Sequence, residues 1–182
     1  MPNSQPGSAY FLEERKDKPA AHTLSILVDN EPGVLARIAG LFSGRGYNIE
    51  SLTVSETEHE KHLSRFTIVT TGTAMVISQI KSQLERLVNV HRVVDLTLSG
   101  DPLERELALL KVAGKGDKRI EALRLAELFR ASVIDASTEH FVFEITGRTT
   151  KIEQFISIMR DLGLVEVSRT GIAAIARGGK VM

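Results

Sequence analysis

One pattern of apolar residues occurs twice in this chain of 182 residues, at a constant spacing of 75 positions. A phenylalanine, a threonine and a glycine open each copy, and apolar residues then recur every third or fourth position, as on one face of a helix. The matched pairs are Phe66/Phe141, Thr71/Thr146, Gly72/Gly147, Ile77/Ile152, Ile80/Phe155, Leu84/Met159, Leu87/Leu162 and Val90/Val165. The repeat predicts two units that share one fold.

Each unit is predicted to have the element order βαββαβ, because β-branched runs alternate with segments of helical spacing. The first unit has strands at 22–28, 47–55, 63–71 and 90–98 and helices at 34–42 and 77–87. The second has strands at 107–112, 133–138, 141–146 and 164–168 and helices at 120–129 and 152–162. A slip of alternation between Ile49 and Leu52 indicates a β-bulge, and Thr150 with Glu153 indicates a capping box.

This order predicts an α+β protein of two tandem ferredoxin-like domains, each an antiparallel sheet with two helices on one face. We divide the chain into a flexible tail (1–21), a first domain (22–98), a linker (99–103) and a second domain (104–182). The final segment, 172–182, is expected to fray or to pack on a neighbour. A bare sheet face has to be paired, covered or charged, so the architecture predicts a dimer or a partner.

Composition excludes several classes of function. Lys+Arg and Asp+Glu both total 23, so the chain lacks the positive excess that nucleic-acid and anionic-membrane binding usually need. There is no cysteine, and hence no disulfide, zinc thiolate or cysteine nucleophile. No apolar run approaches the ~20 residues of a membrane span. Residues 1–21 resemble neither a signal peptide nor a transit peptide, so we expect a cytoplasmic protein.

The turn Asp29-Asn-Glu-Pro-Gly33, just before the first helix, is the leading candidate for a binding site. Helix N-termini present unpaired N–H groups that bind carboxylates and phosphates. Asn30 can cap the helix or bind a ligand, and Gly33 leaves room for a carboxylate beside the backbone. A plain capped turn explains the same residues. The second unit has no such turn, since it is shorter before its Phe141.

Four other features are weaker candidates. Asn48, entering the second strand, offers a donor and an acceptor, but polar residues also simply begin strands. His59 and His62, beside two glutamates, could hold a metal or could belong to an ordinary polar loop. The segment 114–116, Gly-Lys-Gly, lacks the spacing of a phosphate loop and is interpreted as a connector. His91 and His140 are interpreted as ordinary strand residues.

No catalytic motif of the serine-hydrolase, zinc-protease or dinucleotide type is present, and no acid/base pair stands out. A small enzyme on this scaffold is therefore disfavoured, as is an RNA-binding module, which needs aromatic residues on its central strands. The residues alone support a protein that binds a small ligand or a partner.

Two longer segments resemble the regulatory (small) subunit of acetolactate synthase, also called acetohydroxyacid synthase, and its ACT domain. They are Leu24-Ser-Ile-Leu-Val-Asp-Asn-Glu-Pro-Gly-Val-Leu35 and Gly46-Tyr-Asn-Ile-Glu-Ser-Leu-Thr-Val54. The likeness continues through Arg65-Phe-Thr-Ile-Val69, Val90 to Leu96, and Glu104-Arg-Glu-Leu-Ala-Leu-Leu-Lys-Val112, and covers about 22–178. Residues 1–21 do not take part in it.

The resemblance implies a non-catalytic subunit that activates a larger, thiamine-diphosphate-dependent catalytic subunit. That enzyme starts the synthesis of valine, leucine and isoleucine. Thiamine diphosphate, magnesium and FAD would sit on the catalytic subunit, and this chain would hold no cofactor. It would also confer feedback inhibition by valine. A stand-alone amino-acid sensor of the ACT type, acting on another partner, is the alternative.

The resemblance also implies a site. In the family, valine lies between the ACT domains of a homodimer. The residues here that match those positions are Asn30, Gly33, Val34 and Leu35 at the turn and helix start, and Asn48 and Ile49 on the facing strand. The second domain resembles the family's C-terminal domain, which is associated with full sensitivity to valine.

Overall fold

The computed structural model describes residues 18–98 and 100–179, and its elements follow the βαββαβ order twice. The first unit contains β1 (Ala20–Asp29), α1 (Val34–Ser43), β2 (Ser51–Glu58), the 3-10 turn η1 (His59–Lys61), β3 (Leu63–Gly72), α2 (Ala74–Leu84) and β4 (Val90–Asp95). The second contains β5 (Leu103–Val112), α3 (Asp117–Leu128), β6 (Ser132–Ala136), β7 (Phe141–Gly147), α4 (Thr149–Asp161), β8 (Leu164–Arg169) and β9 (Ala173–Ile175).

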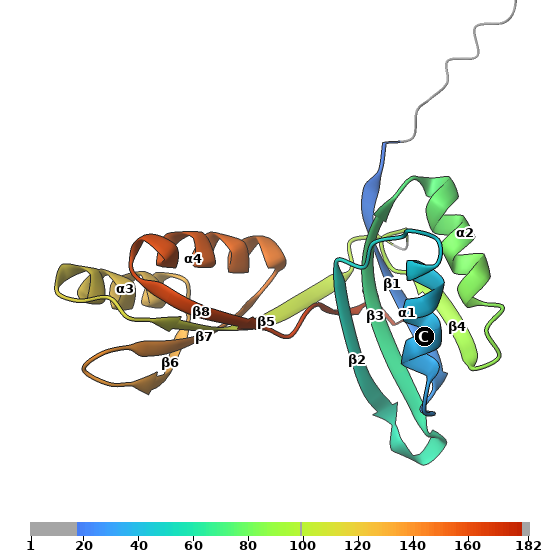
Figure 1. Cartoon of the computed structure of the whole chain (residues 1–182), viewed down its shortest axis with the longest axis horizontal. Coiled ribbons are helices and arrows are strands. Elements are labelled where there is room, and N and C mark those ends of the chain that lie inside the picture. The colour runs from blue at the N-terminus through green and yellow to red at the C-terminus, as the bar shows by residue number, and fades with distance from the viewer. Residues whose placement is uncertain (1–17, 99, 180–182) are drawn as a thin grey trace, which may run out of the picture.

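The two sheets have the same strand order, β2-β3-β1-β4 in the first unit and β6-β7-β5-β8 in the second. All described pairings are antiparallel. Two helices cover one face of each sheet, and the long strand β5 runs from the first unit into the second (Figure 1). The predicted α+β class with tandem ferredoxin-like domains is confirmed.

The repeat extends to a shared irregularity. The register between β1 and β4 shifts at Leu27/Val28, and that between β5 and β8 shifts at Lys111/Val112, in each unit near the end of the first strand. Val28 pairs with Val90 at the start of β4, and Val112 pairs with Leu164 at the start of β8. The connection from α2 to β4 spans residues 85–89, whereas that from α4 to β8 spans only residues 162–163.

Each unit has its own core between sheet and helices. In the first, β1 and β3 pack against α1 and α2 through fully buried side chains: Leu24, Ile26, Ile38, Phe42, Ile68, Ile80 and Leu84. In the second, the Phe143 and Phe155 rings meet edge to face with centroids 6.1 Å apart. Such aromatic pairs stabilise by about 0.5–1.5 kcal/mol beyond the area that they bury. The apolar residues that recur at helical spacing in the sequence are therefore residues of these two cores.

The face of the first sheet that carries no helix is not bare. Residues 103–105 of β5 pair with 173–175 of β9, and this two-stranded ribbon lies against that face. Thr23 and Ser25 are thereby only 5% and 1% exposed. The expectation that 172–182 frays or packs on a neighbour is wrong for 172–175, which pack within the chain.

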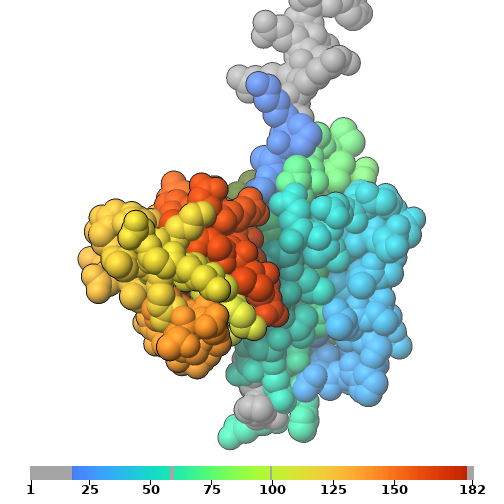
Figure 2. Space-filling model, turned by 60° about the vertical axis from the view of Figure 1, so that its left-hand side comes forward, coloured from blue at the N-terminus to red at the C-terminus, as the bar shows by residue number. Residues whose placement is uncertain are grey.

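Among the described residues, three hydrogen bonds join the units directly. The Thr23 hydroxyl donates to Oε1 of Glu104 (2.6 Å), and the Ile172 N–H donates to Oγ of Ser51 (3.0 Å). The Thr53 hydroxyl donates to the Thr170 carbonyl at 3.4 Å. In the space-filling view the red C-terminal part of the second unit abuts the teal strands of the first (Figure 2). The two units therefore share a packed seam.

Several local predictions differ from the structure. The strand predicted at 47–55 begins only at Ser51, and the register shift of β2 lies at Glu56/Glu58 instead of Ile49 to Leu52. The predicted strand 22–28 begins earlier, at Ala20, and that at 90–98 ends at Asp95. The capping box is also wrong: α4 begins at Thr149 without a side-chain cap, and Glu153 pairs instead with Arg169. Residues 1–17 of the predicted tail lie outside the described residues.

Within the described residues, no helix is long and apolar enough to cross a membrane.

Candidate functional site

The turn between β1 and α1 leaves the N-terminus of α1 without a side-chain cap. The Asn30 N–H donates to the His62 carbonyl (2.7 Å), which ties the turn to the start of β3. Gly33 occupies the N-cap position with φ +87°, in the left-handed region that favours glycine. The first turn of α1 holds no acidic residue. Asn30 does not cap the helix, and no side-chain cap accepts from the N–H groups at the start of α1, where the partial positive charge of the helix lies.

A buried asparagine just before β4 is hydrogen-bonded directly to this turn and to α1. Asn89, 8% exposed, accepts from Nη1 of Arg37 (2.5 Å) and donates to Oε2 of Glu31 (2.8 Å). Its backbone carbonyl accepts from the Asp29 N–H at 3.0 Å. Asn89 was not predicted as a site residue, although an asparagine inside the apolar run 87–90 was the available signal.

His91, an exposed residue of β4, also contacts the turn. Its Nε2 lies 2.6 Å from Oδ1 of Asp29, across the 62 positions that separate the two residues. His91 lies on a strand, as the sequence predicted, whereas the interpretation of His140 as a strand residue is wrong, because it lies in the loop between β6 and β7. Together, Asn89 and His91 hold the turn in one geometry, because each bonds to a residue at its start.

The second predicted group, Asn48 and Ile49, lies in the segment that leads from α1 into β2. The Asn48 carbonyl accepts from the Thr70 hydroxyl (2.7 Å), and the Glu50 N–H donates to the Val69 carbonyl (2.8 Å). Asn48 is exposed, and Ile49 packs half-buried against the core. The backbone of this segment is thus fixed while the Asn48 side chain is accessible.

The apolar residues of the predicted site divide into two kinds. Val34 is 4% exposed and belongs to the core, so it can offer a ligand only its backbone. Leu35 is 48% exposed, which is unusual for leucine in a helix that faces a core. Leu35 and Ile49 are therefore the predicted residues whose side chains remain available to an apolar ligand group.

The two predicted groups do not meet within one chain. Asn30 is bonded to His62 and Asn48 to Thr70, eight positions along β3. Eight strand residues span on the order of 25 Å, with α1 running between the two ends. Within the described residues the two groups therefore do not form one site.

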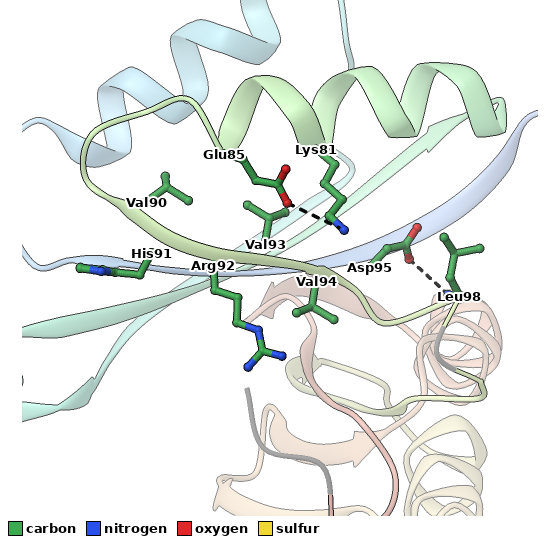
Figure 3. Close-up of a pocket in the computed structure, with 9 residues that line it drawn as sticks. All are labelled: Lys81, Glu85, Val90, His91, Arg92, Val93, Val94, Asp95 and Leu98. Atoms are coloured by element: carbon green, nitrogen blue, oxygen red, sulfur yellow. Dashed lines mark hydrogen bonds and ion pairs between the residues drawn. The ribbon is translucent and has the colours of Figure 1, made fainter.

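Three hollows in the described part of the chain lie elsewhere. One of about 560 Å³ runs between α2 and β4, where Lys81 and Glu85 are paired at 3.8 Å (Figure 3). Another of about 770 Å³ lies in the seam between the units, and a third of about 510 Å³ lies beside the ribbon. Asn30, Gly33, Asn48 and Ile49 line none of these three hollows.

The histidine loop gives no metal centre in the part of the chain that the structure describes. No group of three or more His, Asp or Glu side chains gathers there. His62 is exposed, with φ +49°, and the side chain of His59 lies outside the described residues. Gly114 serves packing, since a Cβ there would lie 2.5 Å from the Leu162 carbonyl oxygen.

Comparison with known proteins first defines the class. Residues 24–92, which contain the turn, α1 and most of the first sheet, match the family model described as the AHAS small subunit-like ACT domain. The first unit is thus an ACT-type regulatory domain. Residues 105–178 match the model described as the small subunit of acetolactate synthase.

Whole-chain relatives narrow the class to one family. A probable acetolactate synthase small subunit of Archaeoglobus fulgidus is 46% identical over 159 residues, 87% of this chain and 98% of the relative. The isozyme 3 small subunit of Escherichia coli is 44% identical over 87% of this chain and 97% of its own length. The crystal structure of the Thermotoga maritima small subunit superposes with a TM-score of 0.81, at 41% identity over 88% and 99% of the chains.

This chain belongs to the acetolactate synthase small-subunit family. It is accordingly a regulatory subunit with a catalytic large subunit as its partner, and not an enzyme by itself. The resemblance found in the sequence is confirmed.

Proposed function

We propose that this chain activates the thiamine-diphosphate-dependent catalytic subunit of acetolactate synthase and makes it sensitive to feedback inhibition by valine or another branched-chain amino acid. Thiamine diphosphate, magnesium and FAD belong to the catalytic subunit in this proposal. The location is cytoplasmic, and neither nucleic acid nor a membrane takes part. Membership of the small-subunit family supports the regulatory role.

The observation that carries the valine proposal is the uncapped, braced N-terminus of α1. An amino acid needs a site for its carboxylate, its ammonium and its side chain. The N–H groups at the start of α1, which no side chain caps, suit the carboxylate. Asn30 and Asn48 offer side-chain oxygens to the ammonium. Leu35 and Ile49 offer apolar surface, and burial of a valine side chain contributes about 1.5–3 kcal/mol.

The site is completed by a second copy of the chain in this proposal. Asn30, Gly33 and Leu35 of one protomer face Asn48 and Ile49 of its partner. Valine then stabilises whichever dimer arrangement holds these groups together. The extent of inhibition is limited by the difference in valine affinity between this dimer arrangement and the arrangement without valine. The valine-bound dimer activates the catalytic subunit less than the valine-free dimer does.

Reconstitution tests the proposal. Acetolactate formation by the catalytic subunit is measured alone, with this chain, and with this chain plus valine. We expect stimulation by the chain and inhibition by valine. Gly33→Asp should still stimulate but should abolish inhibition, since it puts a negative side chain beside the carboxylate site.

Gly178→Asp is the matched control for that variant. Gly178 also has a positive φ (+78°) and open space around its Cβ position, but it lies in the C-terminal segment. It should remain sensitive to valine. Absence of stimulation by the wild-type chain would contradict the activating role and favour a stand-alone sensor. Normal inhibition in Gly33→Asp would place the effector elsewhere.

A further inference from the structure

A hollow of about 510 Å³ lies where the ribbon of β5 and β9 meets the first sheet. We call it the ribbon hollow and define it by its lining residues: Thr53, Ser55, Thr57, Arg65, Thr67, Leu103, Arg105, Ala173, Ala174 and Ile175. On β3, Arg65 and Thr67 alternate with the core residues Phe66 and Ile68. The ribbon hollow therefore lies on the sheet face opposite α1 and is separate from the proposed valine site.

The charge of the ribbon hollow is positive. It is lined by Arg65 and Arg105, and none of its described lining residues is acidic. Nε of Arg65 is fully buried and has no hydrogen-bond partner among the described residues. A buried donor without an acceptor is costly, and more so on a charged group. Because Nε has no exposed surface, an anion in the hollow would contact the Nη groups of the same half-buried guanidinium and offset its charge.

Other polar groups in the ribbon hollow suit the same anion. Ser55 carries a hydroxyl on the same face as Arg65, since the two residues pair directly across β2 and β3. The described bond of Arg105 goes from Nη1 to the Glu104 carbonyl at 2.7 Å and leaves its remaining N–H donors available. A guanidinium fork matches the two oxygens of a carboxylate.

The wall formed by the ribbon is apolar. Leu103 and Ile175 pair with each other across the ribbon and remain 37% and 53% exposed. Ala173 and Ala174 complete this wall without adding a polar side chain. An inorganic anion would leave this surface in water. A ligand that joins a carboxylate to a hydrocarbon group would cover both parts of the hollow.

We propose that the ribbon hollow binds a small amphipathic carboxylate, with the carboxylate against Arg65 and the hydrocarbon tail against Leu103 and Ile175. The volume falls in the range of about 300–1,000 Å³ that small-molecule sites occupy. The site is formed by both units, because its basic and hydroxyl groups come mainly from the first sheet and its apolar wall from β5 and β9. The proposal does not depend on the valine site.

The test uses octanoate as the probe and the full chain labelled with ¹⁵N. Amide shifts are followed in a titration, with octanol and acetate as probes that keep only the tail or only the charge. We expect saturable shifts at Ser55, Thr67, Leu103 and Ile175, with octanoate binding tighter than either partial probe. Saturating valine should not displace octanoate.

Two variants of Arg65 test whether its positive charge contributes to octanoate binding. Arg65→Gln should weaken octanoate binding about tenfold or more, because a charge-assisted hydrogen bond is lost, whereas Arg65→Lys should weaken it less. Arg86→Gln, an exposed arginine after α2, is the matched control and should bind octanoate normally. Thermal melts verify that each variant is folded.

Three results would overturn the proposal. They are an absence of saturable octanoate binding to the wild-type chain, shifts confined to residues outside the ribbon hollow, and equal octanoate affinity in wild type and Arg65→Gln. Binding only of a peptide that ends in a free carboxylate would likewise overturn it and point to a protein partner.

Discussion

Gly33 shows how a single backbone conformation determines the turn before α1. Its φ of +87° favours glycine, while the space around its Cβ position is open. Gly33→Ala should therefore lower the free energy of unfolding by only about 1–2 kcal/mol, the cost of left-handed backbone for an L-residue. Urea denaturation measures this change.

Gly114→Ala provides the contrast. Its Cβ would meet the Leu162 carbonyl oxygen at 2.5 Å, so backbone would have to move. We expect a greater loss of stability than for Gly33→Ala. Equal losses of stability would mean that a steric clash of the added Cβ, and not only the left-handed backbone, destabilises Gly33→Ala.

The ion pair of Glu106 and Arg169 is the most buried charged contact of the second unit. Glu106 is 4% exposed, and its two oxygens accept from Arg169 at 2.7 and 2.8 Å. These hydrogen bonds are the main reason that the pKa of Arg169 is raised. Glu106→Ala should lower the free energy of unfolding by about 1–3 kcal/mol, because it leaves a half-buried charge without that partner.

Lys111→Ala is the matched control for Glu106→Ala. The Lys111–Glu166 pair is also short, at 2.8 Å, but both side chains are exposed. Its loss should change stability by less than about 0.5 kcal/mol. Similar effects of the two variants in urea would show that burial does not set the strength of the Arg169 pair.

At the scale of the elements, Asp101 ties the connector between the units to the C-terminal segment. Its carboxylate accepts from Arg148 and from Arg177, each at 3.0 Å. The Arg148 hydrogen bond first, and then that of Arg177, lowers the pKa of Asp101 from 3.8. A lowered pKa means that the contact stabilises the fold above the unfolded-state pKa and is lost as pH falls through the folded-state pKa.

We therefore expect amide protection in 173–177 to fall when the pH drops below about 3.8. Asp101→Asn should produce the same local loss at neutral pH, since it removes the charge without changing size. Hydrogen exchange measures both. Unchanged protection in Asp101→Asn would show that the ribbon is held by its strand pairing alone.

Gly171 controls how the C-terminal segment crosses β2. A Cβ there would lie 2.8 Å from Oγ1 of Thr53 and 3.0 Å from Oγ of Ser51, and φ is +81°. Gly171→Ala should push the segment away and weaken the Ile172–Ser51 hydrogen bond, at a cost of about 1–3 kcal/mol. The expected result is a loss of amide protection at Ile172. Gly178→Ala, with similar φ but open space, should leave Ile172 protected.

A helix or strand was predictable from the sequence where its buried residues follow a local apolar pattern. Helices α1, α2 and α4 and strands β3 and β7 bury the residues that periodicity selected. β9 could not be predicted, because three residues give no period and their pairing with β5 spans about seventy positions. Thr150 and Glu153 fit a capping box locally, but Glu153 pairs with Arg169, which lies on another element.

The candidate site was predictable only in part for the same reason. The turn at Asn30 and Gly33 stands out in the sequence through its own residue types and the resemblance. Asn89 and His91 act on that turn from about sixty positions away. No local pattern indicates such contacts, and only the fold of the first unit brings them together.

At the scale of the whole molecule, the separation of the two residue groups is the main structural reason to expect a dimer. Asn30 and Asn48 are tied to positions of β3 that lie on the order of 25 Å apart. The proposed site therefore needs two copies of the chain, which links ligand binding to subunit arrangement.

Valine binding by mixed dimers tests this central claim most directly. Gly33→Asp chains and Asn48→Ala chains are prepared separately, and calorimetry should detect no valine binding to either homodimer. When the two are mixed, each heterodimer pairs an intact turn with an intact Asn48 of the other chain. We predict that one valine site per heterodimer reappears with wild-type affinity. If the mixture binds no more valine than the separate variants, each site lies within one chain, and the proposed site shared between two protomers is wrong.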